Sequence, residues 1–122
     1  MTALKRILLA EDDPGGVELT VGALKEFNLT NDVQVVNDGE ECLDYLHRRG
    51  EYASREAGNP AVLLLDLKMP KVSGLEVLEE LRADPKLSMI PVVVMTSSTE
   101  ERDLAESYRL GTNAFIVKPI DV

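Results

Sequence analysis

The sequence predicts an α/β fold in which five short strands form a parallel sheet and a helix follows each of the first four. The 122-residue chain carries four nearly continuous apolar runs, at Ile7–Ala10, Val62–Leu65, Val92–Met95 and Ala114–Val117. Such runs are too short for helices, and continuous hydrophobicity is typical of strands that are buried on both faces of a parallel sheet. The weaker run Val33–Val36 contains a glutamine and has polar neighbours, which fits an edge strand.

Each segment between the runs begins with side chains that can cap a helix. The caps are Asp13 before Pro14, Asp38 with Glu41, Ser73 with Glu76, and the cluster Ser98 to Glu101. Gly50 and Gly111 are expected to end the second and fourth helices, and the third is expected to end near Pro85. Strands that alternate with helices predict right-handed crossovers and a doubly wound sheet of order 2-1-3-4-5.

Length and composition limit the class of protein. A chain of 122 residues predicts one domain, residues 1–122. The single cysteine, Cys42, excludes an intrachain disulfide and suggests a reducing compartment, and no signal peptide precedes the first strand, so we expect a cytoplasmic protein. The net charge of -9 argues against direct binding of nucleic acid or an anionic membrane, and no apolar run has membrane-spanning length.

The end of the sequence raises a separate expectation. Val122 follows shortly after the fifth predicted strand, whereas a sheet of this order needs a further helix to cover one face. We therefore expect the final helix to be missing or truncated, with association into a homodimer through the uncovered face.

Chemically active side chains follow four of the predicted strands. Glu11 and Asp12 come after the first, Asp66 ends the third, Thr96 follows the fourth and Lys118 follows the fifth. The carboxyl ends of parallel strands meet at one edge, where sites form. Clustered carboxylates without His or Cys favour Mg²⁺ or a similar hard cation. Lys118 and Thr96 suit the other side of a phosphoryl group, and Asp66 can be the nucleophile that forms an aspartyl phosphate.

Each of these residues also has an ordinary structural interpretation. An acidic run after a strand is usually a solvated loop, a lone aspartate often forms a turn, and a Lys-Pro pair can be a surface turn. Their joint appearance at one sheet edge is what favours a site. His47, at the polar end of the second helix, is expected to be exposed and not to relay phosphoryl groups.

Four motifs together resemble the receiver domain of two-component response regulators, the CheY-like superfamily with a flavodoxin-like fold. They are Leu8–Pro14, Leu64–Pro70 with Gly74, Val94–Ser97 and Gly111–Pro119. The resemblance covers essentially the whole chain. It implies a signalling protein that accepts a phosphoryl group from a histidine kinase and catalyses only its own phosphorylation and dephosphorylation.

The resemblance also implies a role for each residue at the site. Asp66 would be the phosphoacceptor, and Mg²⁺ would be bound by Glu11, Asp12, Asp66 and the backbone carbonyl of Lys68. Thr96 and Lys118 would contact the phosphoryl group, Phe115 would be the aromatic switch, and the Lys118–Pro119 bond would be cis. The surface of the fourth helix and fifth strand would then bind a downstream partner or an onward phosphotransfer protein.

The segments Asp44–Leu46 and Gly50–Tyr52 are similar to single-domain regulators that work with bacterial phytochrome kinases. A bacteriophytochrome is therefore the implied kinase. Lys68 departs from this subgroup, in which Asn is more frequent. We hypothesise that Lys68 and Ser98 set how long the phosphate persists.

Three other functions fit the same fold less well. A flavin-binding electron carrier would need a hydroxyl-rich phosphate loop, where this chain has Glu11 and Asp12. A phosphatase of the haloacid dehalogenase type would need an aspartate two residues after Asp66, where this chain has Lys68. A degenerate receiver that binds partners without phosphorylation is disfavoured by the intact acidic residues.

Overall fold

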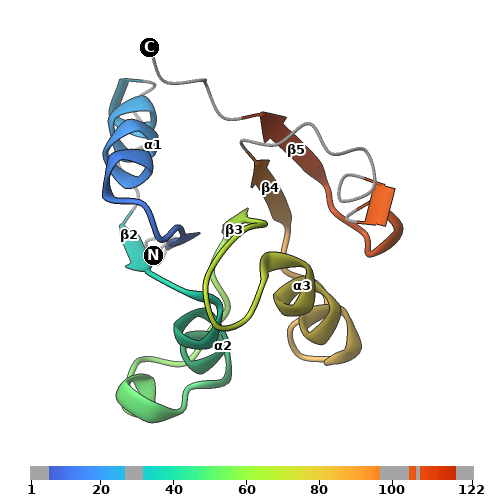
Figure 1. Ribbon diagram of the computed structural model, residues 1–122. Helices are drawn as coiled ribbons and strands as arrows, with labels where there is room; N and C mark the ends of the chain where they lie inside the picture. The colour runs from blue at the N-terminus through green and yellow to red at the C-terminus, as the bar shows by residue number, and fades with distance from the viewer. Residues whose placement is uncertain (1–5, 27–31, 97–104, 107, 118–122) are drawn as a thin grey trace.

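The fold is a five-stranded parallel sheet. The computed structural model describes residues 6–26, 32–96, 105–106 and 108–117. Its strands are β1 (Ile7–Ala10), β2 (Val33–Val36), β3 (Val62–Asp66), β4 (Val92–Thr96) and β5 (Ala114–Val117). Neighbouring strands pair in parallel in the order β2-β1-β3-β4-β5 (Figure 1), which confirms the predicted order and the edge position of β2.

In the part of the chain that the structure describes, an α-helix follows each of β1, β2 and β3, and two of the caps of these helices form as predicted. The helices are α1 (Pro14–Glu26), α2 (Gly39–His47) and α3 (Gly74–Ala83). The Gly15 N–H donates to Asp13 Oδ1 over 3.3 Å, so Asp13 caps α1. At α3, the Glu76 N–H donates to Ser73 Oγ over 3.2 Å and the Ser73 N–H donates to Glu76 Oε1 over 3.3 Å, a complete capping box.

The predicted acidic capping box of α2 forms with one change. The Glu41 N–H donates to Asp38 Oδ1 over 2.7 Å, as expected. The Glu41 carboxylate, however, accepts from the N–H of Asn37, one residue before the cap, at 2.8 Å. The Glu41 carboxylate therefore accepts from a backbone N–H that precedes the helix, and not from the N–H of the cap residue Asp38.

Gly50 does not end α2, so that prediction was wrong. Arg48 caps the helix in the left-handed region (φ 56°), and its N–H donates to the carbonyls of Asp44 and Tyr45. These bonds satisfy carbonyls at the helix end and offset the steric cost of this backbone at a non-glycine residue. Gly50, with φ 60°, begins the 3₁₀ helix η1 (Gly50–Tyr52) in the segment between α2 and β3.

The fourth predicted helix is described only in part. Residues 105–106 and 108–109 are helical, and Gly111 follows them with φ 83°, its N–H donating to the carbonyl of Tyr108 over 3.0 Å. A glycine therefore lies where this helix was predicted to end. The Ser98 to Glu101 cap, Lys118, the Lys118–Pro119 bond and the expected final helix lie outside the described residues.

Helices cover both faces of the sheet, with α2 and α3 on one face and α1 on the other (Figure 1). The α2 and α3 side holds one buried cluster, to which the strands contribute Leu8, Ala10, Val36, Leu63, Leu65, Val92 and Val94. The buried thiol of Cys42 belongs to the same cluster. Within the described part of the chain, no helix combines the length and apolar character needed to cross a membrane.

His47 differs from its predicted exposure. Its side chain is only 23% exposed, because α3 packs against the end of α2 at this point. His47 Nε2 lies 3.3 Å from Glu80 Oε1 and Nδ1 lies 3.8 Å from Asp84 Oδ2. Helix amphipathicity within α2 alone did not reveal these partners on another helix.

Candidate functional site

The carboxyl edge of the sheet brings three acidic side chains together. Glu11 directly follows β1 and Asp66 ends β3, and these two strands pair in register, with Ala10 opposite Leu65. One carboxylate oxygen from each of Glu11, Asp12 and Asp66 can be chosen so that all three lie within 4.8 Å of one another. The structure therefore assembles the three carboxylates that the sequence placed at this edge.

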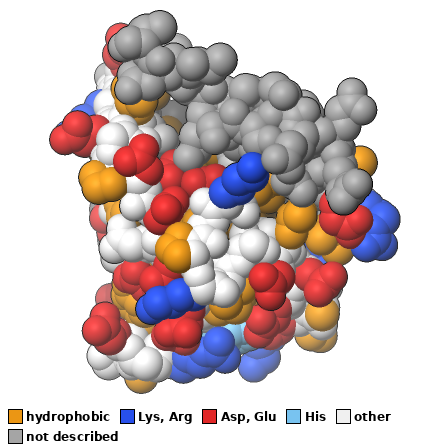
Figure 2. Space-filling view, in the orientation of Figure 1, with side chains coloured by type: hydrophobic (Ala, Val, Ile, Leu, Met, Phe, Trp, Pro, Cys, Tyr) orange, Lys and Arg blue, Asp and Glu red, His pale blue; other side chains and the backbone are white. Residues whose placement is uncertain are grey.

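Burial distinguishes the members of this acidic cluster. Glu11 is fully buried and Asp66 is 5% exposed, whereas Asp12 is exposed. Figure 2 shows acidic side chains grouped near the middle of the view, beside a Lys or Arg side chain. Carboxylates this close raise one another's energy when ionised, and a bound cation removes the repulsion. A donor set made only of hard oxygens fits Mg²⁺ or Mn²⁺.

Two short local hydrogen bonds orient the buried carboxylates. The Asp13 N–H donates to Glu11 Oε2 over 3.2 Å, and the Lys68 N–H donates to Asp66 Oδ1 over 3.1 Å. In each case a carboxylate accepts from the backbone N–H two residues further on, and at Asp66 this is the Asx-turn that aspartate favours. The chain segments that leave β1 and β3 therefore help to hold the acidic cluster in place.

Two glycines lie so close to Glu11 and Asp66 that a larger residue would collide with them. A Cβ added at Gly16, in the first turn of α1, would lie 2.7 Å from Glu11 Oε1. A Cβ added at Gly74, at the start of α3, would lie 2.3 Å from the backbone oxygen of Asp66. Gly74 belonged to a motif recognised in the sequence, whereas Gly16 was missed because only the packing of α1 over Glu11 reveals its role.

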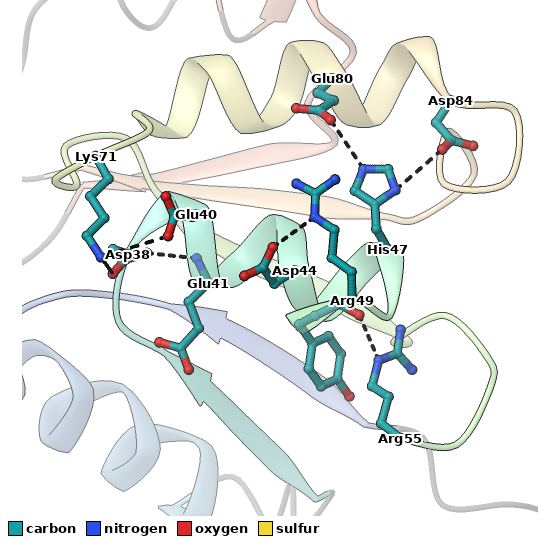
Figure 3. A network of polar contacts seen from close by, with 11 residues as sticks. Asp38, Glu40, Glu41, Asp44, His47, Arg49, Arg55, Lys71, Glu80 and Asp84 are labelled. Atoms are coloured by element: carbon teal, nitrogen blue, oxygen red, sulfur yellow. Dashed lines mark hydrogen bonds and ion pairs between the residues drawn. The ribbon is translucent and has the colours of Figure 1, made fainter. Parts of the chain in front are cut away.

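The loop after β3 is joined to the start of α2 (Figure 3). Lys71 has a positive φ of 68°, and its Nζ lies 3.6 Å from Asp38 Oδ2 and 3.9 Å from Glu40 Oε1. A Cβ at Gly39 would lie 1.8 Å from the carbonyl oxygen of Val72, so these two backbones touch. Sequence reasoning missed Lys71, whose contacts depend on the packing of two distant segments.

The remaining predicted site residues are described in part or not at all. Thr96 is the last residue of β4 and pairs with Val117 of β5, so its backbone lies at the same edge as Asp66. Phe115 lies within β5 and pairs with Val94. The side chains of Thr96 and Phe115, and the whole of Lys118, lie outside what the structure describes.

A parallel sheet of this order with three carboxylates at its carboxyl edge is the arrangement found in receiver domains. The family model for the response regulator receiver domain matches residues 7–122. The chain therefore belongs to the response regulator receiver domain family of two-component signalling.

Similar proteins include response regulators, among them a bacteriophytochrome response regulator. Response regulator Rcp1 of Synechocystis sp. is 38% identical over 114 residues, which are 93% of this chain and 76% of Rcp1. The solved bacteriophytochrome response regulator RtBRR is 56% identical with a TM-score of 0.90, and the match covers 98% of this chain and 72% of the solved chain.

Two further solved structures bear on the chemistry of the site. The Mn²⁺-bound form of Rcp1 is 36% identical with a TM-score of 0.88, covering 97% of this chain and 84% of the solved chain. A phosphorylated cyanobacterial phytochrome response regulator, RcpA, is 42% identical with a TM-score of 0.88. The match covers 98% of this chain and 84% of the solved chain.

Proposed function

We propose that this chain is a receiver domain, formed by residues 1–122, that accepts a phosphoryl group from a histidine kinase on the carboxylate of Asp66. The observation that carries the proposal is the position of Asp66, which is 5% exposed and grouped with Glu11 and Asp12 within 4.8 Å. The phosphorylated state of the similar protein RcpA supports it.

The acidic cluster would hold a divalent cation, which we propose is Mg²⁺. Glu11, Asp12 and Asp66 would supply carboxylate oxygens and Lys68 its backbone carbonyl, and the Mn²⁺-bound form of Rcp1 supports a divalent cation here. When bound, the cation would neutralise the charge that the carboxylates and the phosphoryl oxygens bring together.

The transfer itself needs positioning more than acid–base chemistry. Asp66 Oδ attacks phosphorus, a P–O bond forms, and the P–N bond to the kinase histidine breaks with its electron pair going to the histidine nitrogen. The Lys68 N–H fixes one carboxylate oxygen at 3.1 Å, which limits the rotation of the nucleophile. Attack of water on the phosphorus later restores the carboxylate and releases phosphate.

The rest of the switch is proposed from family roles. Thr96 and Lys118 would contact the phosphoryl group, and Phe115 would move inward as Thr96 is drawn toward it. The fourth helix and β5 would then bind a downstream protein or a phosphotransfer protein. This chain would act as a cytoplasmic signalling domain, and its only catalysis would be its own phosphorylation and dephosphorylation.

We further propose a phytochrome-type histidine kinase as the phosphoryl donor. The support is similarity to the bacteriophytochrome response regulator RtBRR at 56% identity and to the phytochrome response regulator RcpA at 42% identity. We expect the rate of phosphoryl transfer from a purified bacteriophytochrome kinase to be at least tenfold higher than the rate from an unrelated kinase. Equal rates from both kinases would contradict this part of the proposal.

The central experiment is incubation with acetyl phosphate and Mg²⁺, followed by intact mass measurement. We expect one phosphoryl adduct on the wild type and none on Asp66→Asn. Asp44→Asn is the matched control, because Asp44 lies on α2 away from the acidic cluster and loses the same charge. An adduct that persists in Asp66→Asn, or that never forms on the wild type, would refute the assignment.

Lys68 is proposed to set the lifetime of the phosphorylated state. It is exposed and lies two residues after Asp66, where its side chain can meet water that approaches the phosphoryl group. We expect Lys68→Asn to change the dephosphorylation rate severalfold, measured by the decay of the adduct after removal of acetyl phosphate. An unchanged rate would contradict this role.

A further inference from the structure

A concave site lies at the opposite end of the sheet from the acidic cluster. It is a surface cavity of about 560 Å³, lined by the end of α2 and by residues of two loops, namely Ala53, Arg55, Ala57, Gly58 and Asn59 in the first and Asp84, Lys86 and Leu87 in the second. These two loops lead into β3 and β4 and so lie at the amino ends of these strands, whereas the acidic cluster lies at the carboxyl ends of β1 and β3. The cavity is therefore separate from the proposed phosphoryl site.

Cationic side chains converge on this cavity in a chain whose net charge is -9. Arg48, Arg55 and Lys86 all line it. Within the described residues, none of these three makes an ion pair with a carboxylate, whereas Arg6, Arg49, Lys71 and Arg109 do. Figure 2 shows Lys and Arg side chains gathered at the lower edge of the molecule, around the only histidine.

Arg55 is the most constrained of the three. Its Nε donates to the Tyr45 carbonyl over 2.7 Å, its Nη1 donates to the carbonyls of Glu56 and Gly58, and its Cζ lies 4.1 Å from the Tyr45 ring centroid (Figure 3). Burial lowers the pKa of Arg55, but a guanidinium still carries its charge at neutral pH. A partly buried cation that is satisfied only by carbonyls and a ring is one that an anion would stabilise.

Arg48 and Lys86 are exposed and frame the same cavity. Arg48 occupies the left-handed cap position of α2, and one of its Nη atoms donates to the Arg55 carbonyl over 3.0 Å. The backbone carbonyl of Lys86 accepts from Asn59 Nδ2 over 2.8 Å, which joins the two loops that border the cavity. The backbone positions of the cations are therefore set by structured segments.

The opposing charges at the cavity are few. Asp84 is the acidic residue in the lining, and it faces His47, whose other nitrogen faces Glu80 (Figure 3). Three cations and one carboxylate leave an excess of two positive charges in the lining. Leu46, Ala53, Ala57 and Leu87 add apolar surface beside them.

We propose that this cavity binds a small molecule that carries a phosphate group and an apolar portion. Guanidinium N–H groups and a lysine point charge suit phosphate oxygens, and the excess of two charges matches a phosphate dianion. The cavity volume lies within the roughly 300–1,000 Å³ usual for small-molecule sites. Binding would join the end of α2 to the loops before β3 and β4, and so connect a ligand to the helix whose start contacts the loop after Asp66.

The test is a titration of the full chain with inorganic pyrophosphate in the presence of EDTA. Binding is measured from the changes in amide chemical shifts in NMR spectra. EDTA removes divalent cations that would recruit phosphate to the acidic cluster. We expect saturable shifts at residues 48, 55–59 and 86, with Kd rising about tenfold in Arg48→Gln and in Lys86→Gln, since each removes a charge-assisted contact. Citrate, a carboxylate anion, is expected to bind more weakly.

Arg49→Gln is the matched control, because it removes the same charge from the neighbouring residue, which pairs with Asp44 and does not line the cavity. Its Kd should stay within about twofold of wild type, since general attraction of an anion is weak in water. Shifts that do not saturate, equal weakening in Arg49→Gln, or tighter binding of citrate would each overturn the proposal.

Discussion

The helices on the two faces of the sheet are buried to different extents. Helix α2 has five buried residues and α3 has four, whereas α1 has none: Val17, Val21 and Leu24 are half-buried and Leu19 is 61% exposed. Since a fully buried large aliphatic side chain stabilises the fold by about 1.5–3 kcal/mol, most of the helix-to-sheet stabilisation among the described residues lies on the α2 and α3 face.

The acidic cluster lies at the boundary of these two faces. Glu11 is covered by Gly16 in the first turn of α1, while Asp66 is approached by Gly74 at the start of α3. Asp66, the proposed phosphoacceptor, therefore lies against the well-packed face, and its acidic neighbour Glu11 lies against the less buried helix. Four substitutions test this contrast, taken in order of expected effect.

Gly39→Ala should cause the largest loss of stability. Its Cβ would lie 1.8 Å from the Val72 carbonyl oxygen, so the backbone of α2 or of the loop after β3 must move. We expect the free energy of unfolding to fall by about 3 kcal/mol or more, measured by urea denaturation. A change below about 1 kcal/mol would show that the α2 face is not tightly packed here.

Cys42 should make stability depend on alkaline pH. Burial raises the pKa of its thiol from 9.0 to about 12, with smaller contributions from Glu41 and Asp38. Above pH 9 the unfolded chain loses this proton and the folded chain keeps it, so the stability present below pH 9 is lost as the pH rises toward 12.

Cys42→Ala removes this proton from both states and should flatten the decline by up to about 1.4 kcal/mol per pH unit, measured by urea denaturation between pH 8 and 10.5. Tyr52, whose pKa burial and Glu41 also raise, is present in both proteins and cancels in the difference. Identical slopes for the two proteins would contradict the burial of the thiol.

Ser73→Ala should cost less, because it removes one cap of α3. The Glu76 N–H would lose its acceptor, and the loss of such a cap typically costs about 1 kcal/mol. Thermal unfolding should show a lower Tm, while Ser73→Asp, which restores an acceptor, should recover most of it. If Asp fails to rescue, the effect of Ser73→Ala does not arise from capping.

Gly22→Ala should have the smallest effect and the opposite sign to Gly39→Ala. Gly22 lies in the middle of α1, and nothing lies within 4 Å of an added Cβ. Alanine should raise the free energy of unfolding by about 0.5–1 kcal/mol through helix propensity alone. Destabilisation in the same urea assay would mean that α1 packs more closely than the structure shows.

The structural elements that depend only on residues close together in the sequence were predictable from the sequence. Continuous apolar runs predicted the strands, and Asp13, Asp38 and Ser73 predicted helix starts, because capping is a contact within one turn. The acidic cluster followed from the rule that parallel strands end at one edge, which brought Glu11 and Asp66 together without knowledge of side-chain packing.

Only the tertiary structure decided what depends on contacts between distant segments. Three features each need two or more elements in their final places: the half-buried His47 between Glu80 of α3 and the C-cap residue Asp84, the contact of Lys71 with Asp38, and the cavity bordered by Arg48, Arg55 and Lys86. The sequence by itself determined the order of strands and helices and the residues at the carboxyl edge, because hydrophobic period and local hydrogen bonds act over a few residues. The packing of helices and loops determined burial, charge pairing and the second site, because these depend on the distances between elements that are far apart in the chain.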